Sequence, residues 1–94
     1  MDCYGVLITN GVILQWGWGI VQGSHYYLDT NIIFPISFSN GVSYAINISS
    51  AFTQAVIARI AGTTRIPTGV TIRLEDKSTV AITSVQFFWI AVGF

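Results

Sequence analysis

The residues best suited to bind a ligand stand close together, in the stretch from Gly23 to Asp29. His25, Tyr26 and Tyr27 place three aromatic rings near the carboxylate of Asp29. A sugar is typically bound by a flat apolar surface against its C–H faces and by a few polar groups at its hydroxyls. Tyrosine offers both in one rigid side chain. We therefore predict that this stretch is an exposed loop that binds carbohydrate. The alternative is that its tyrosines belong to the core or to a subunit interface.

Three residues outside this stretch are further candidates for the same surface: Trp18, Arg59 and Arg65. Trp18 comes shortly before the predicted loop and would add another ring. The two arginines, in or beside a second loop, would pair with phosphate or carboxylate groups of a ligand. For each arginine the alternative is a solvated or subunit-bridging role.

The chain offers little for catalysis or metal binding. Its single histidine, four carboxylates and single cysteine form no convincing acid–base pair. The adjacency of Ser24 and His25 does not define a catalytic triad, which depends on geometry. A metal site at His25, the single histidine, would require further histidines from other copies of the chain. We expect neither enzymatic activity nor a metal or cofactor.

Composition indicates which partners to expect. Hydrophobic residues make up 52% of the 94 residues and charged residues 9%, against about 25% charged in a typical soluble domain. One small domain cannot bury that much apolar surface alone, which favours an oligomer. The net charge of zero argues against a nucleic-acid partner, which requires a basic patch.

Neither a membrane-spanning helix nor an internal disulfide is expected. Glycines and amides interrupt the apolar stretch before Asp29, which does not suit a spanning helix. Cys3 is the only cysteine and therefore has no partner within the chain.

The closing stretch, residues 86–94, is predicted to be the strand around which the fold is organised. It carries no charge and no proline, and its aromatic and β-branched residues favour a pleated strand. Apolar residues stand on both alternating faces, with Phe87 and Trp89 on one and Phe88 and Ile90 on the other. Such a strand is typically covered on both sides, and part of that cover is expected from another subunit.

The other runs predict six further short strands separated by turn signals. Asn-Gly at residues 10–11 and again at 40–41 indicates tight turns, and Pro35 ends a strand or places it at a sheet edge. Residues 75–78, which include the charge cluster Glu75-Asp76-Lys77, are expected to form an exposed hairpin turn. The strands are predicted at residues 5–9, 12–18, 30–34, 42–49, 54–60 and 70–74. Because no credible helix is present, the expected fold is all-β, a small antiparallel β-sandwich of about seven short strands in one domain.

Three segments of the sequence resemble one known family, the C-terminal tip domain of bacteriophage and prophage tail fibres. Residues 10–17 read Asn-Gly-Val-Ile-Leu-Gln-Trp-Gly, residues 34–38 read Phe-Pro-Ile-Ser-Phe, and residues 89–94 read Trp-Ile-Ala-Val-Gly-Phe. All three are similar to family motifs, in the same order and at suitable spacing, so the resemblance covers nearly the whole chain. One departure is Phe94, which stands where the family frequently has tyrosine.

The resemblance implies a homotrimeric β-sandwich, similar in architecture to a group of trimeric lectins, that contacts the host cell surface. On that basis residues 1–9 would form an N-terminal strand at the junction with the fibre shaft, and residues 10–94 the tip domain. The expected function is non-enzymatic recognition of a host polysaccharide such as lipopolysaccharide. The expected location is a virion tail fibre, assembled in the host cytoplasm and extracellular after release. The alternatives are a purely structural knob that trimerises and caps the fibre, and a free-standing trimeric lectin.

Overall fold

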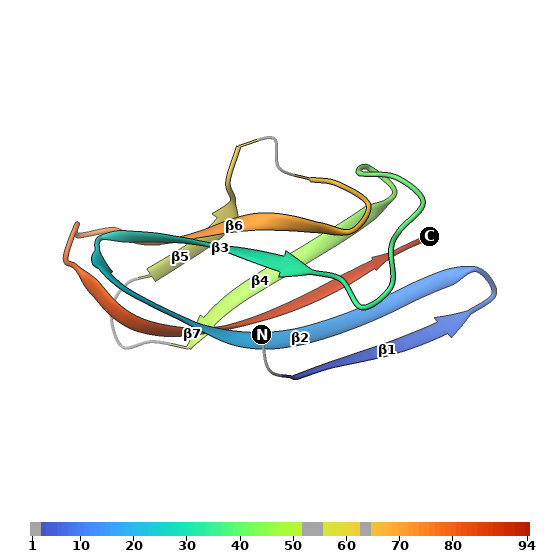
Figure 1. Cartoon of the computed structure of the whole chain (residues 1–94), viewed down its shortest axis with the longest axis horizontal. Coiled ribbons are helices and arrows are strands. Elements are labelled where there is room, and N and C mark those ends of the chain that lie inside the picture. The colour runs from blue at the N-terminus through green and yellow to red at the C-terminus, as the bar shows by residue number, and fades with distance from the viewer. Residues whose placement is uncertain (1–2, 52–55, 63–64) are drawn as a thin grey trace.

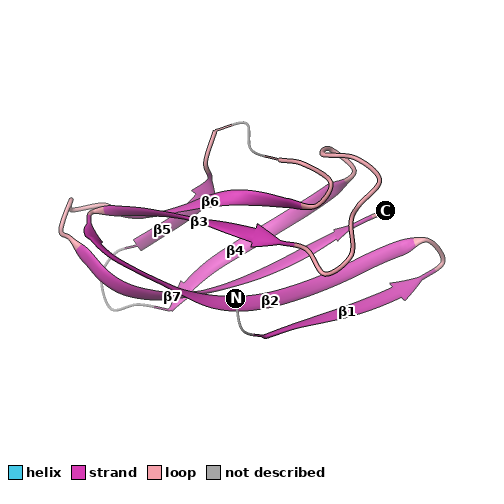
Figure 2. Ribbon diagram, viewed as in Figure 1, coloured by secondary structure: helices cyan, strands magenta, loops and turns pink. Residues whose placement is uncertain are grey.

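The computed structural model describes residues 3–51, 56–62 and 65–94, which fold as two antiparallel sheets packed face to face (Figures 1 and 2). The four-stranded sheet has the order β1-β2-β7-β4 and the three-stranded sheet the order β3-β6-β5. The strands are β1 (Cys3–Thr9), β2 (Val12–His25), β3 (Tyr27–Ile33), β4 (Tyr44–Ala51), β5 (Val56–Ile60), β6 (Gly69–Asp76) and β7 (Ile82–Gly93). No helix occurs among the described residues, and the all-β prediction of about seven strands is confirmed. The first two residues of the strand predicted at 54–60 lie outside the described residues.

The closing strand β7 is one of the two inner strands of the four-stranded sheet. It pairs with β2 on one side and with β4 on the other. Its inward face is buried, with Phe87 and Trp89 each 2% exposed, whereas outward-facing Phe88 and Ile90 are 42% and 47% exposed. The predicted division of its side chains between two faces is therefore confirmed, but within one chain only the inward face is covered.

The three family-like segments meet at one end of the core. Gln15, from the first segment, is fully buried. Its Nε2 donates to the carbonyl of Ile36 at 2.8 Å, and the Ile36 N–H donates to its Oε1 at 3.1 Å. In the second segment the ring of Phe34 packs against that of Trp89, from the third, at 5.6 Å between centroids. These contacts explain physically why the three family-like segments, which lie far apart in the chain, occur together.

Replacing Gln15 with leucine is expected to destabilise the fold by about 1–3 kcal/mol, because both main-chain polar groups of Ile36 lose their partner in a buried place. Chemical denaturation at fixed protein concentration measures this loss. The matched control is Gln22→Leu on the same strand, where the side chain is exposed, and little change is expected there. Equal effects of the two substitutions would contradict the role assigned to Gln15.

The β1–β2 hairpin extends beyond the three-stranded sheet (Figure 1). Its turn is formed by Asn10 and Gly11, with φ of 51° and 79°. Positive φ at both positions is the geometry that an Asn-Gly pair adopts in two-residue hairpins, so this turn prediction is confirmed. Because β1 lies outside the sandwich, Tyr4 and Ile8 remain 61% and 54% exposed although they lie on the inward side of their sheet.

The predicted loop from Gly23 to Asp29 is wrong. β2 continues to His25 and β3 begins at Tyr27, which leaves only Tyr26 between two strands. The Tyr27 N–H donates to Nδ1 of His25 at 3.4 Å and helps to close this turn. The polar residues that suggested a loop lie on exposed strand surface. Gln22 and His25 pair with Ser84 and Ile82, with a shift of register between them, and Tyr27 to Asp29 pair with β6.

The predicted exposed turn at residues 75–78 is also only partly right. Glu75 and Asp76 belong to β6, and Asp76 is only 2% exposed. Its Oδ1 accepts hydrogen bonds from the N–H groups of Ser78 at 2.7 Å and Val80 at 3.2 Å. The carboxylate therefore satisfies the main chain of the following turn, and this role is the reason for its burial.

Candidate functional site

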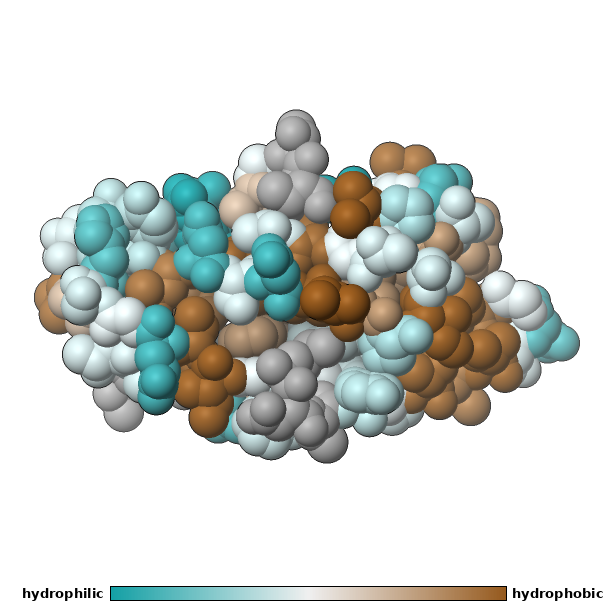
Figure 3. Space-filling view, viewed as in Figure 1, coloured by the Kyte–Doolittle hydropathy of each residue, from teal (hydrophilic) through white to brown (hydrophobic). Residues whose placement is uncertain are grey.

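The outward side of the three-stranded sheet is polar and carries four of the seven charged residues that the structure describes. The strand register places Asp29 opposite Arg73, and Arg73 opposite Arg59, and residues paired in this way point to the same side of a sheet. Hydrophilic residues gather over β3, β5 and β6 in Figure 3, which looks onto this side. We call this surface the polar face; its members are Tyr27, Asp29, Asn31, Arg59, Thr71, Arg73 and Glu75.

Arg73, on the central strand β6, organises the polar face. Its Nε and Nη2 donate to Oδ1 and Oδ2 of Asp29 at 2.7 and 3.0 Å, a bidentate geometry. Its guanidinium also lies over the ring of Tyr27, 4.3 Å from the centroid, within range of a cation–π interaction. Both contacts restrict the side chain, so its remaining donors are held in place before any ligand arrives.

The Asp29–Arg73 pair persists through mildly acidic conditions. The hydrogen bond from Arg73 lowers the pKa of the Asp29 carboxyl below its ordinary value of 3.8, although partial desolvation acts in the opposite direction. The contribution of the pair is therefore present above pH about 4 and is lost as the pH falls through the lowered pKa. Exposed pairs of this kind add little to stability. The more important consequence of the Asp29–Arg73 pair is that it orients the remaining hydrogen-bond donors of Arg73.

A second pair lies beside the first. Arg59 Nη2 is 3.2 Å from Glu75 Oε1, so the outward carboxylates Asp29 and Glu75 each face an arginine. Because Arg73 lowers the pKa of the Asp29 carboxyl, Asp29 is stabilised in its ionised form and does not suit a general acid. The arrangement is better suited to binding hydroxyl and anionic groups than to catalysis.

Three aromatic rings form a cluster at the end of the polar face where β2 turns into β3. His25 lies 4.6 Å from Tyr26 and 4.5 Å from Tyr27 between ring centroids, and the two tyrosines are 5.1 Å apart. His25 is exposed and both tyrosines are half-buried. The cluster adjoins Arg73 through Tyr27. The predicted mixture of rings and charges is therefore brought together in space.

Two predicted residues lie elsewhere. Trp18 pairs with Phe88 on the outward side of the other sheet. Arg65 donates from Nε to the carbonyl of Gly41 at 3.0 Å and from Nη2 to the carbonyl of Tyr44, and its guanidinium lies 4.3 Å from the centroid of the Tyr44 ring. These contacts hold Arg65 against Gly41 and Tyr44 of its own chain, a role that differs from the solvated or subunit-bridging alternative. Burial raises the pKa of the Tyr44 hydroxyl beneath it.

Sequence reasoning missed the central residue of this surface, Arg73, and its neighbours Thr71 and Glu75. A signal was present, because these residues alternate with Val70, Ile72 and Leu74 along one predicted strand. The alternation marks an outward polar side, but the partners of Arg73 become known only from the pairing of β6 with β3 and β5.

The outward side of the four-stranded sheet has the opposite character. Leu14, Trp16 and Trp18 on β2 lie opposite Val92, Ile90 and Phe88 on β7, and none of these outward side chains is charged. We call this surface the apolar face; its members are Leu7, Leu14, Trp16, Trp18, Ile20, Phe88, Ile90 and Val92. Trp16 lies across Gly5 on β1, where a Cβ would collide with the indole ring. A continuous apolar surface of this kind is typical of a protein–protein contact.

The apolar face is uneven, with large side chains on β2 and β7 beside small ones on β4. On β4 the outward side chains are small: Ala45 opposite Val92, Asn47 opposite Ile90 and Ser49 opposite Phe88. Two shallow hollows, of about 260 and 370 Å³, open between β4 and β7. Large side chains on β2 and β7 thus stand beside a lower region on β4, a shape into which another apolar surface could pack.

Within the described residues, no group of three or more histidine, cysteine, aspartate or glutamate side chains is arranged to hold a metal ion. The same residues contain no helix long and apolar enough to cross a membrane.

Comparison with known proteins gives a family and a fold. Residues 7–94 match the model of the family described as tail fiber protein gp53-like, C-terminal, whereas a search of curated proteins found no match. The structure is similar to an R1 pyocin fibre of P. aeruginosa (TM-score 0.55, 17% identity, 98% of this chain and 28% of that chain). It is also similar to an R2 pyocin fibre of P. aeruginosa (0.57, 21%, 98% and 26%) and to the tailspike gp61 of Pseudomonas phage phi297 (0.62, 15%, 86% and 15%). The chain therefore spans less than a third of each of these proteins.

Proposed function

The chain belongs to the gp53-like tail fibre C-terminal family, and from this we propose that it is the receptor-binding tip of a phage or pyocin tail fibre. In this proposal three copies assemble through the apolar face, and the polar face of each copy contacts polysaccharide on the host cell. The tip recognises its receptor without chemical reaction. The single observation that carries the proposal is that two outward surfaces of one sandwich have opposite character.

The apolar face supports assembly. Trp16, Phe88 and Ile90 are each between 42% and 47% exposed in one chain and stand beside the hollows next to β4. Packing of the ridge of one copy into the hollow of the next is a heterologous contact, which closes into a ring when the rotation allows. The number three follows from the resemblance to tail-fibre tips and not from the shape of one chain.

The polar face supports recognition of a surface polysaccharide. Arginine and tyrosine are the residue types that most often carry binding energy at exposed surfaces, and here Tyr27 and Arg73 are already fixed against each other. Phosphate or carboxylate groups of lipopolysaccharide would meet the guanidinium groups of Arg59 and Arg73, and sugar rings would stack on the tyrosines. Each site would be weak, and repetition over three copies and several fibres would raise the overall affinity.

Replacing Tyr27 with alanine is expected to reduce binding to surface polysaccharide roughly tenfold or more per site, because the ring contributes contact area and orients Arg73. The measurement is binding of the assembled protein to an array of purified bacterial polysaccharides. Arg73→Gln is expected to act in the same direction. The matched control is Tyr4→Ala, since Tyr4 is an exposed tyrosine on the other sheet.

Thermal melting should remain nearly unchanged in the Tyr27 and Arg73 variants, because both side chains lie on the surface. If wild type binds no polysaccharide on the array and still assembles as a trimer, a purely structural knob replaces the proposed receptor-binding tip. If polysaccharide binds equally well to wild type and to both variants, recognition lies away from the polar face. Release of shortened saccharide during the assay would contradict the non-enzymatic role.

A further inference from the structure

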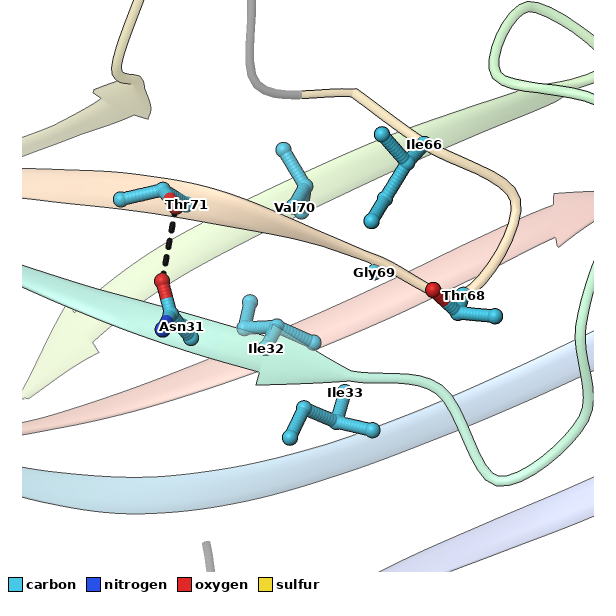
Figure 4. A pocket seen from close by; sticks show the side chains of 8 residues that line it. All are labelled: Asn31, Ile32, Ile33, Ile66, Thr68, Gly69, Val70 and Thr71. Atoms are coloured by element: carbon cyan, nitrogen blue, oxygen red, sulfur yellow. Dashed lines mark hydrogen bonds between the residues drawn. The ribbon is translucent and has the colours of Figure 1, made fainter.

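A pocket of about 400 Å³ opens at the far end of the polar face, where β3 ends and β6 begins (Figure 4). Ile33 and Ile66 form its walls and are 69% and 53% exposed. Gly69 lies between them (Figure 4), and a Cβ at this position would collide with the carbonyl oxygen of Ile32. The floor is therefore main chain, and the pocket is fixed by the close pairing of β3 with β6.

Polar groups stand at one side of this pocket. The Thr71 hydroxyl donates to Oδ1 of Asn31 at 2.7 Å, a bond that orients the Asn31 side chain and leaves its Nδ2 group available as a donor. The Thr68 side chain is exposed and lies at the opposite end of the pocket (Figure 4). Among the residues that the structure describes, no charged side chain lines the pocket, although Arg73 lies two residues beyond Thr71 on the same side of β6.

This combination favours a small neutral ligand with an apolar substituent. Burying an aliphatic group between the isoleucine side chains is favourable because apolar surface leaves water. Binding an ionised group here is unfavourable, because the group would be desolvated without a partner of opposite charge. The volume lies within the range of about 300–1,000 Å³ that is usual for small-molecule sites. Amide and hydroxyl groups at the rim are suited to fix the orientation of a sugar through its hydroxyls.

We propose that this pocket is a subsite for a neutral sugar unit that presents a methyl group, carried either by a 6-deoxy carbon or by an acetamido group. The inference rests on the proposed function, since it extends the polar face along the same outward side. From Tyr27 to Ile33 the strand rises by about 20 Å, so a short oligosaccharide could contact Arg73 and the pocket together. Specificity for the receptor would come from the pocket, and attraction to charged groups from the arginines.

The test uses saturation-transfer NMR on the whole chain with four free monosaccharides as probes. The methyl-bearing probes are L-fucose and N-acetylglucosamine, and their matched controls, which carry no methyl group, are L-galactose and glucose. Fucose and N-acetylglucosamine are expected to receive saturation mainly at their methyl protons and to bind about tenfold more tightly than their controls, as expected for one added group in an apolar pocket. If only L-fucose gives a methyl signal, the pocket binds a 6-deoxy carbon. If only N-acetylglucosamine gives one, the pocket binds an acetamido group.

Variants of the walls place this signal in the pocket. Ile33→Ala and Ile66→Ala are expected to weaken the methyl signal about tenfold, whereas Ile57→Ala should not, because Ile57 is an exposed isoleucine on the same sheet outside the pocket. Tyr27→Ala should leave the methyl signal of these small probes intact. Methyl-bearing probes that bind no better than their controls, or that bind the wall variants equally well, would overturn the subsite.

Failure of the subsite can be told apart from failure of the proposed function. If polysaccharide binding depends on Tyr27 while the sugar probes give no methyl signal, the receptor-binding face stands and the subsite is wrong. If the probes bind in the pocket while no polysaccharide binds, the subsite stands and the receptor-binding role is wrong. If Ile33→Ala changes the mass of the assembly and the probes give no signal, the pocket is a contact between copies, which also overturns the subsite.

Discussion

Trp89→Ala is expected to abolish the native fold. Trp89 is 2% exposed, lies on an inner strand of the four-stranded sheet and packs against Phe34. Truncation of a large buried aromatic side chain costs about 3–5 kcal/mol, which approaches the whole stability of many small domains. Circular dichroism and thermal melting at fixed protein concentration measure the loss.

The neighbouring substitution Phe88→Ala is the control for this prediction. Phe88 lies on the same strand but points outward and is 42% exposed, so its removal leaves the interior of the sandwich intact. The Phe88 variant should retain the circular dichroism of a β-sheet protein. A Trp89 variant that keeps native circular dichroism and melting would show that β7 does not organise the fold.

Ile90→Lys is expected to dissociate the trimer into folded single chains. In the proposed assembly every copy would bury a lysine at the apolar face, and an uncompensated charge at an interface is costly. Ile57→Lys is a closely matched control, because Ile57 is 44% exposed and Ile90 47% exposed, but Ile57 lies on the outward side of the three-stranded sheet. Light scattering coupled to size exclusion should give three times the chain mass for wild type and Ile57→Lys.

For Ile90→Lys the expected mass is that of one chain, 10.3 kDa, with the circular dichroism of the folded protein. Equal masses for the two lysine variants would remove the apolar face from the assembly. Both substitutions add the same charge at an exposed strand residue. A difference in mass between the two variants therefore reports on the interface and not on the fold.

Much of the fold could be predicted because most strands have one buried side. Polar residues alternate with Val70, Ile72 and Leu74, each of which is 4% exposed or less. The two-residue spacing of these apolar side chains in the sequence is therefore a direct consequence of burying one side of the strand. The Asn10-Gly11 turn could be predicted because its backbone requires positive φ. The end of β2 could not, because exposed strand residues and loop residues are equally polar.

The candidate site was less accessible from sequence because its contacts join distant residues. Asp29 and Arg73 are 44 residues apart in the chain, and only the register of β3 against β6 brings them together. Gln15 and Ile36 present the same difficulty in the core. By contrast, His25, Tyr26 and Tyr27 are consecutive, so their cluster could be predicted even though the surrounding loop was wrong.

The proposed assembly requires that the apolar face is covered while the polar face remains open. Hydroxyl-radical footprinting of the native protein tests it most directly. Trp16 and Phe88, each 42% exposed in a single chain, are expected to be protected in wild type and to react in the Ile90→Lys variant, whereas His25 and Tyr27 should react in both. Reaction of Trp16 and Phe88 in wild type to the extent seen in the variant would contradict the proposed assembly.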